Sequence, residues 1–311
     1  MSKIGMTRLP GPAAWFRASA RMLNQRILPC MERPISALGG DLRRRPPTFI
    51  IGPPRCGSTL AIQVLTEALD LGFISNAHAA WFGAPAVAEL AIRCVRRRSP
   101  SDFRSDLGRT FGRYAPSECP AWWYRFFPTQ PPYVGPHDLD SSRLVRFRRS
   151  IQALTAASGR PLVFKNLYAS LRIHPIVASV PESIFIVIKR STEDVARSLL
   201  AARLKEFGTH DRWLSIEPPN VEELRKLPPS QQVLGQVESI YELIRADLAR
   251  ARVPAQQVFE LDYQVLCAAP GECAQRYQEH LRLLGVPVVS REVVSSDAIA
   301  RARGPREISP S

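Results

Sequence analysis

The sequence has few residues of the kinds that bind metal ions. It contains six cysteines and five histidines among 311 residues. No two cysteines are spaced as C-x-x-C, and no cluster of histidines accompanies them, so the spacing predicts no zinc site. Unpaired cysteines of this kind are typical of reduced thiols.

Long apolar runs are also missing. No stretch approaches the roughly 20 consecutive apolar residues of a membrane-spanning helix. The apolar pieces near the N-terminus are interrupted by basic residues, so they do not form the core of a secretory signal. We therefore expect a cytoplasmic protein. The interrupting residues are Arg8, Arg17, Arg21 and Arg26.

Acidic residues are outnumbered. The chain has 28 Asp and Glu against 42 Lys and Arg, which gives a net charge of +14. Such a surplus favours an anionic partner, such as a nucleic acid, a membrane surface or a small polyanion. The other interpretation is a compositional bias towards Ala, Arg and Pro that has no partner. No RNA-binding or DNA-binding motif is present, so we expect no nucleic acid as partner.

The N-terminal part differs in composition from the rest. Residues 1–46 are basic and hold several Pro and Gly, and we interpret them as an arm. Helical spacing of apolar residues predicts one helix over 13–28. This helix either packs on the main domain, which we favour, or makes peripheral contact with a membrane surface.

Residues 47–311 alternate between short apolar runs and helical patterns. The alternation predicts a single α/β domain with a central parallel sheet flanked by helices. Five consecutive apolar residues, Ile184 to Ile188, are typical of a strand covered on both faces. The predicted strands are 47–52, 160–166, 183–190 and 257–263. The predicted helices are 58–72, 80–98, 141–158, 192–207, 230–252 and 271–286.

The segment "FIIGPPRCGSTL" almost contains a nucleotide-binding phosphate loop, G-x-x-x-x-G-K-[ST]. Gly52 and Gly57 have the right separation, and Ser58 and Thr59 follow, but the lysine is absent. A strand, a glycine-bounded loop and a helix together aim backbone N–H groups at a phosphate. We expect this loop to bind a terminal 5′ phosphate or phosphosulfate, with positive charge from Arg55. The alternative is an ordinary turn.

A second anion site is predicted where the strongest strand ends. Arg190 follows this strand, and Ser198 lies eight residues further on, in the next helix. Ligands of open parallel sheets bind at the carboxyl ends of the strands. These two side chains could hold another phosphate. Taken alone, they could also be an ion-pair partner and a helix-surface residue.

Together these segments resemble the sulfotransferase family, in family order over roughly residues 47–285. "PRCGST" resembles the 5′-phosphosulfate loop, with Cys56 at a position where the family usually has a hydroxyl residue. "IVIKRSTEDVARS" resembles the 3′-phosphate motif, and "PLVFKN" resembles the strand that carries the family's lysine. "FELDYQVLCAAP" resembles a late segment in which Tyr263 matches. "WLSIEPP", Trp213 to Pro219, resembles the W-x-x-x-x-P-P segment of bacterial sulfotransferases.

The resemblance implies a P-loop-like three-layer fold and the co-substrate 3′-phosphoadenosine 5′-phosphosulfate (PAPS), without a metal ion. It implies that Lys165 neutralises charge on the leaving phosphate. In a place comparable to the family's C-terminal basic segment, Arg301 and Arg303 are further candidates for the 3′-phosphate. The implied donor-binding residues are Arg55, Cys56, Gly57, Ser58, Thr59, Arg190, Ser198, Tyr263, Arg301 and Arg303.

The general base cannot be transferred from the family motif. Leu167 stands where some branches have a histidine after the lysine. The remaining candidates are His78 and Glu118, each of which could instead be structural.

The acceptor is predicted only as a hydroxyl group on a small molecule or a glycan. The aromatic stretch "AWWYRFF" suits either the wall of a pocket for a carbohydrate or lipid-linked acceptor, or the core. Other functions left open are a P-loop kinase or nucleotide hydrolase, a non-catalytic polyanion-binding protein, and an inactive relative that still binds PAPS.

Overall fold

A computed structural model describes residue 19 and residues 21–37, 40–95, 101–138, 140–291 and 294–303. Its centre is a sheet of five parallel strands in the order β2-β5-β1-β6-β7. The strands are β1 (Thr48–Ile51), β2 (Gly72–Phe73), β5 (Leu162–Lys165), β6 (Ile184–Lys189) and β7 (Val258–Asp262). The predicted parallel α/β fold is therefore confirmed.

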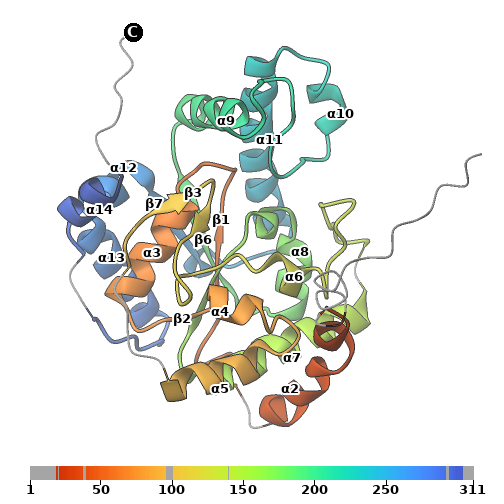
Figure 1. The fold of residues 1–311 in the computed structure, drawn as a ribbon, viewed down its shortest axis with the longest axis vertical. Coiled ribbons are helices and arrows are strands. Elements are labelled where there is room, and N and C mark those ends of the chain that lie inside the picture. The colour runs from red at the N-terminus through yellow and green to blue at the C-terminus, as the bar shows by residue number, and fades with distance from the viewer. Residues whose placement is uncertain are drawn as a thin grey trace, which may run out of the picture.

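Helices cover both faces of this sheet (Figure 1). One face carries α3 (Ser58–Ala68), α12 (Tyr263–Ala268), α13 (Pro270–Leu283) and α14 (Ser296–Arg303). The other carries α6 (Pro120–Trp123), α7 (Ser141–Ser158), α8 (Ile173–Ser179) and α11 (Pro229–Arg250). The shorter elements are α4 (Asn76–Ala79), α10 (Val221–Leu224) and two 3₁₀ helices, η1 (Leu167–Leu171) and η2 (Ala255–Gln257).

The two faces of the sheet form two separate apolar clusters, because neighbouring side chains of a strand point to opposite sides. Phe49 and Ile51 of β1 belong to the cluster under α7 and α8, whereas Ile50 belongs to the cluster under α3 and α13. Both layers are needed to bury β6, whose residues Ile184 to Ile188 are all buried. These two clusters fix the strands and hence the places where they end.

The aromatic stretch is part of the core. Trp122, Trp123, Phe126 and Phe127 are buried in the cluster under α7, and only Tyr124 is largely exposed. Trp122 stacks on a ring of β5, and its indole N–H donates to Ser150 of α7. The stretch therefore belongs mainly to the core, although Phe126 also lines a cavity beside Tyr124.

Before β1, the chain is helical over 21–26 and again in α2 (Leu28–Ala37), which packs on α5 (Pro85–Val95) and α7. The predicted helix over 13–28 is therefore observed over 21–26 and is followed by a second helix, α2, while residues 13–18 and 20 lie outside the described part. The division into residues 1–46 and 47–311 stays a prediction. Among the described residues, no helix combines the length and the apolar character needed to span a bilayer.

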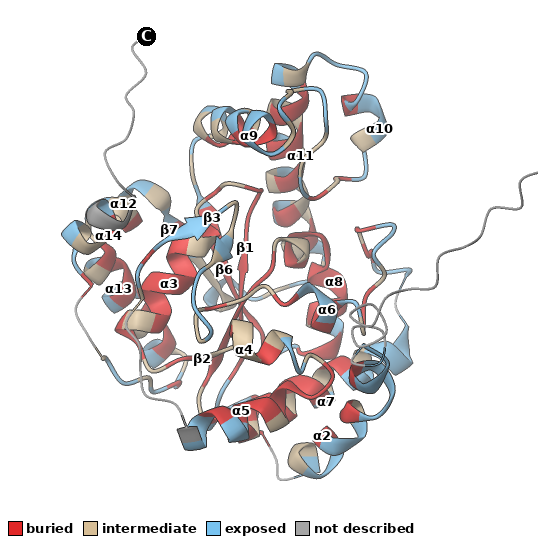
Figure 2. Ribbon diagram, viewed as in Figure 1, coloured by how far each residue is buried: buried red, intermediate tan, exposed pale blue. Residues whose placement is uncertain are grey.

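Two antiparallel strands lie outside the main sheet. β3 (Ser105–Asp106) and β4 (Arg109–Thr110) form a small hairpin. The remaining long helix, α9 (Thr192–Phe207), begins directly after β6 and packs on α11. Figure 2 shows β3 as exposed and α9 as a mixture of exposed, intermediate and buried residues.

Candidate active site

A cavity of about 1270 Å³ opens at the carboxyl ends of four neighbouring strands. β1 leads into the glycine-bounded loop, and β5 ends at Lys165. β6 is followed by Arg190, and β7 by Tyr263; all three of these side chains line the cavity. The sheet therefore brings together residues that are up to about 200 positions apart in the sequence, at the edge where open parallel sheets bind their ligands.

The loop between β1 and α3 forms one wall. Arg55 and Gly57 have positive φ angles, +67° and +105°, so the chain turns sharply before α3 begins at Ser58. Gly57 has no side chain with which to cap this helix. The first backbone N–H groups of α3 therefore lie at the cavity wall, where the helix dipole favours an anion.

Tyr263 packs directly against this loop. A Cβ atom added to Gly57 would lie 2.3 Å from Cδ2 of Tyr263, which is far inside van der Waals contact. Glycine is therefore required twice at this position, by the backbone angle and by the ring above it.

Replacing Gly57 with alanine is expected to lower the free energy of unfolding by about 1–3 kcal/mol, because it adds both backbone strain and a clash. Denaturant unfolding measures the change. Gly208→Ala is the matched control, since Gly208 has a φ of +70° but nothing within 4 Å of an added Cβ. Equal losses in the two variants would contradict the close packing of Tyr263.

Two arginines stand side by side in the cavity. Nη1 of Arg190 donates to the backbone oxygen of Arg55 at 2.9 Å, and Nε of Arg55 donates to Oγ of Ser198 at 3.3 Å. The guanidinium carbon of Arg190 lies 4.1 Å from the ring centre of Tyr263. Burial and the neighbouring charge of Arg190 lower the pKa of Arg55.

This arginine pair still has hydrogen-bonding capacity. Nε of Arg190 is buried and has no hydrogen-bond partner among the described residues. A buried donor without a partner is costly unless a ligand or water satisfies it. Two concentrated positive charges and an unsatisfied donor are the features expected of a phosphate site.

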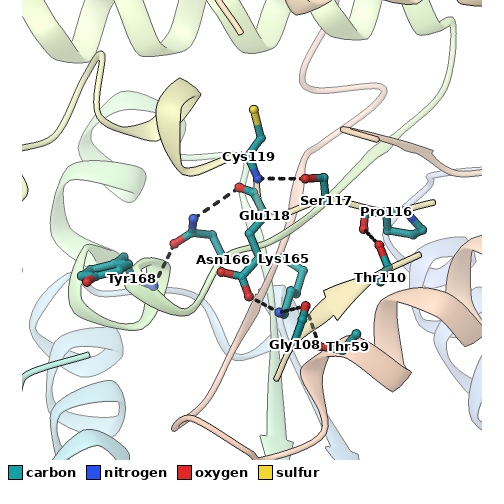
Figure 3. Close-up of polar contacts among 10 residues, drawn as sticks. All are labelled: Thr59, Gly108, Thr110, Pro116, Ser117, Glu118, Cys119, Lys165, Asn166 and Tyr168. Atoms are coloured by element: carbon teal, nitrogen blue, oxygen red, sulfur yellow. Dashed lines mark hydrogen bonds and ion pairs between the residues drawn. The ribbon is translucent and has the colours of Figure 1, made fainter. Parts of the chain in front are cut away.

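A second polar cluster surrounds Lys165 (Figure 3). Its side chain is only 4% exposed and forms a short ion pair with Oε1 of Glu118, which is 26% exposed. Asn166 donates to the backbone oxygen of Glu118 at 3.3 Å, which holds this residue beside the end of β5. Both charged side chains line the cavity.

The tip of the β3–β4 hairpin reaches into this cluster. The backbone oxygen of Gly108 accepts from Nζ of Lys165 at 3.4 Å and from Oγ1 of Thr59 at 3.5 Å. Gly108 has a φ of +88°. At its outer side the hairpin is joined to α9 by an ion pair of 2.6 Å between Asp106 and Lys205.

His78 lies away from the described cavity lining. It is buried in α4, where its Nδ1 contacts Ser75 and its Nε2 contacts Oε2 of Glu89 at 3.1 Å. Both ring nitrogens are thus engaged in structural contacts. Of the two predicted candidates for the base, the structure brings only Glu118 to Lys165.

The thiol of Cys56 points into the core and not into the cavity. It is fully buried, and a Cβ added to Gly52 would meet its sulfur at 2.7 Å. Burial raises the pKa of this thiol, which keeps it neutral. A direct contact of the Cys56 side chain with a ligand is therefore not supported.

The predicted role of Arg301 and Arg303 stays a prediction. Both residues fall at the end of α14, where only the backbone is described.

The residue that sequence reasoning missed is Gly108. Leu107 and Gly108 form the turn of this hairpin with positive φ angles, but Leu-Gly is not one of the pairs that signal a hairpin in a sequence.

Sheet, loop and cavity together define an α/β protein with a cavity lined by basic side chains at the strand ends. The sulfotransferase family model matches residues 46–284. The chain belongs to the sulfotransferase family and is an enzyme of this class. No curated protein sequence is significantly similar to the chain.

Two solved structures support the fold. The chain is similar to sulfotransferase STF9 from Mycobacterium avium, with 17% identity and a TM-score of 0.57, over 96% of this chain and 78% of that one. It is also similar to sulfotransferase STF1 from Mycobacterium tuberculosis H37Rv, with 14% identity and a TM-score of 0.50, over 94% of this chain and 79% of that one. These likenesses confirm the predicted P-loop-like fold.

Proposed function

We propose that this sulfotransferase moves a sulfuryl group from PAPS to a hydroxyl group of its acceptor. The observation that carries the proposal is the pair of polar clusters in one cavity. Arg55, Arg190 and Ser198 suit a phosphate, and the Lys165–Glu118 pair lies beside the loop at the start of α3. The two clusters lie at the ends of β5 and β6, on either side of β1, and this arrangement suits a ligand with two anionic ends.

The residues at hand fit this donor. The unsatisfied Nε of Arg190 offers a hydrogen bond to the 3′-phosphate. At the other end, Lys165 and Thr59 already donate to one oxygen atom, that of Gly108. In the donor complex we assign these two groups, together with the N–H groups of Gly57 and of α3, to the 5′-phosphosulfate.

When bound, the donor supplies the sulfuryl group for an in-line displacement. The acceptor oxygen forms a bond to sulfur as the bond between sulfur and the phosphate oxygen breaks. We assign to Glu118 the proton released by the acceptor hydroxyl, and to Lys165 the charge that develops on the leaving phosphate oxygen. Lys165 is the last residue of β5 and its ammonium group contacts Glu118, so one cation can stabilise both this carboxylate and the leaving phosphate oxygen.

In this proposal the acceptor is a compound with a hydroxyl group. The aromatic stretch 121–127 no longer supports a carbohydrate or lipid-linked acceptor in particular. Four of the five rings that suggested it are buried in the core.

The kinase alternative predicts a Mg²⁺-dependent site for a triphosphate. Such a site would need a lysine directly after Gly57, but this chain has Ser58 there.

Calorimetric titration with 3′-phosphoadenosine 5′-phosphate, with and without Mg²⁺, tests the donor site. We expect metal-independent binding that Arg190→Ala weakens at least about tenfold, because charged hydrogen bonds are lost. Arg197→Ala is the matched control, since this arginine also lines the cavity but is largely exposed and paired with Asp194. Binding of ATP only with Mg²⁺, or no binding at all, would overturn the proposal.

A further inference from the structure

The helical segment 21–37 is attached to the protein by buried polar side chains as well as by apolar ones. Asn24 donates to the backbone oxygen of Ala80 at 3.1 Å and accepts from the N–H of Gly83 at 2.9 Å. Glu32 accepts from the N–H of Ala86 and from Oγ of Ser150, both at 2.9 Å. These contacts fix the orientation of the segment.

The buried stripe of this segment is therefore unusual. Asn24, Leu28 and Glu32 follow one another at intervals of four residues, and all three are buried. Two of the three are polar, whereas the stripe that a helix buries is normally apolar.

The neighbouring stripe is apolar and faces outwards. Leu23, Ile27 and Met31 repeat the same four-residue interval and are 41%, 57% and 47% exposed. Met22, which is 56% exposed, extends the stripe. We name these four residues the outer stripe. α2, which carries Met31, lies at the rim of the molecule (Figure 2).

Within residues 21–37, the exposed charged side chains beside the outer stripe are all positive. Arg21, Arg26 and Arg33 are exposed on the same segment. Its one acidic residue, Glu32, is buried, and burial raises the pKa of this carboxyl to about 7. Apolar side chains among arginines are the composition of helices that lie in the headgroup region of anionic membranes.

The charge also argues against two other partners. A second copy of the chain, placed with twofold symmetry on this face, would bring like charges together. Nucleic acid would accept the arginines, but it would leave the four apolar side chains in water.

We propose that the outer stripe is a docking surface for an anionic lipid bilayer. The apolar side chains enter the headgroup region, and Arg21, Arg26 and Arg33 contact lipid phosphates or carboxylates. The surface is independent of the proposed donor site, because none of its residues lines the cavity at the strand ends.

Sedimentation of the full chain with lipid vesicles tests the surface. We expect binding to vesicles of phosphatidylcholine mixed with phosphatidylserine, weak binding to phosphatidylcholine alone, and release by salt. The variant Leu23→Ser/Ile27→Ser/Met31→Ser should weaken binding roughly tenfold to a hundredfold. It removes three half-exposed apolar side chains that would otherwise move from water into the bilayer. Leu204→Ser/Leu283→Ser/Val289→Ser is the matched control, since these exposed residues lie outside the segment.

Two exposed cysteines provide a second measurement. An environment-sensitive fluorophore on Cys30, within the segment, should shift to the blue on binding to mixed vesicles. The same label on Cys94 of α5 should not shift; in each protein the other exposed cysteine and Cys267 are replaced by serine. Absence of vesicle binding, equal weakening by both triple variants, or equal shifts at both labels would overturn the proposal. Binding to RNA but not to vesicles would overturn it as well.

Discussion

Lys165→Ala is expected to lower the turnover number about 100-fold to 1000-fold, the usual loss when a charge-stabilising donor is removed from an active site. Lys165 is the buried cation at the end of β5, and it contacts both Glu118 and the backbone oxygen of Gly108. Its charge acts where negative charge develops on the leaving group. Affinity for 3′-phosphoadenosine 5′-phosphate should change far less, since Arg55 and Arg190 remain.

The measurement is transfer from radiolabelled PAPS to an acceptor found by screening, with turnover number and KM determined separately. Lys205→Ala is the matched control. Lys205 also lines the cavity and also pairs with a carboxylate, but this pair is exposed and joins only the hairpin to α9. Exposed pairs contribute about 0–1 kcal/mol, so this loss should stay below about tenfold. A turnover number for Lys165→Ala within tenfold of the unchanged protein would contradict the role of this lysine.

Much of the sheet could be predicted because its strands carry strong local signals. The buried run from Ile184 to Ile188 and the run before Gly52 each predict a strand, and both are observed in the sheet. β2 has only two residues, Gly72 and Phe73, and it exists because it pairs with β5. Such a strand has no periodic pattern that sequence reasoning could use.

The site could be predicted in part for a simple geometric reason. Arg190 and Lys165 lie at the ends of parallel strands, and such ends meet at one edge of a sheet. Gly108 could not be predicted, because it reaches Lys165 through a hairpin 57 positions earlier in the chain. His78 and Glu118 looked alike as candidates. Only tertiary packing separates them, since it places His78 against Glu89 and Glu118 against Lys165.

Glu118→Gln is expected to lower the turnover number about 100-fold to 10,000-fold, the range for the loss of a general base. The amide keeps the size of the side chain and a hydrogen bond towards Lys165, but it cannot take the proton of the acceptor hydroxyl. Donor binding should be nearly unchanged, because Arg190 and Ser198, which are assigned to the 3′-phosphate, lie directly after β6 and in α9. Single-turnover transfer to the screened acceptor measures the chemical step.

Asp106→Asn is the matched control for Glu118→Gln. Asp106 also lines the cavity, and its carboxylate also pairs with a lysine, namely Lys205 of α9. The control should lose less than about tenfold, as expected for an exposed pair. The double variant Lys165→Ala/Glu118→Gln adds a further test. If both groups act in the same step, its loss of turnover should be much smaller than the product of the two single losses. Equal losses in Glu118→Gln and Asp106→Asn would mean that charge in the cavity, and not proton transfer to Glu118, determines the rate.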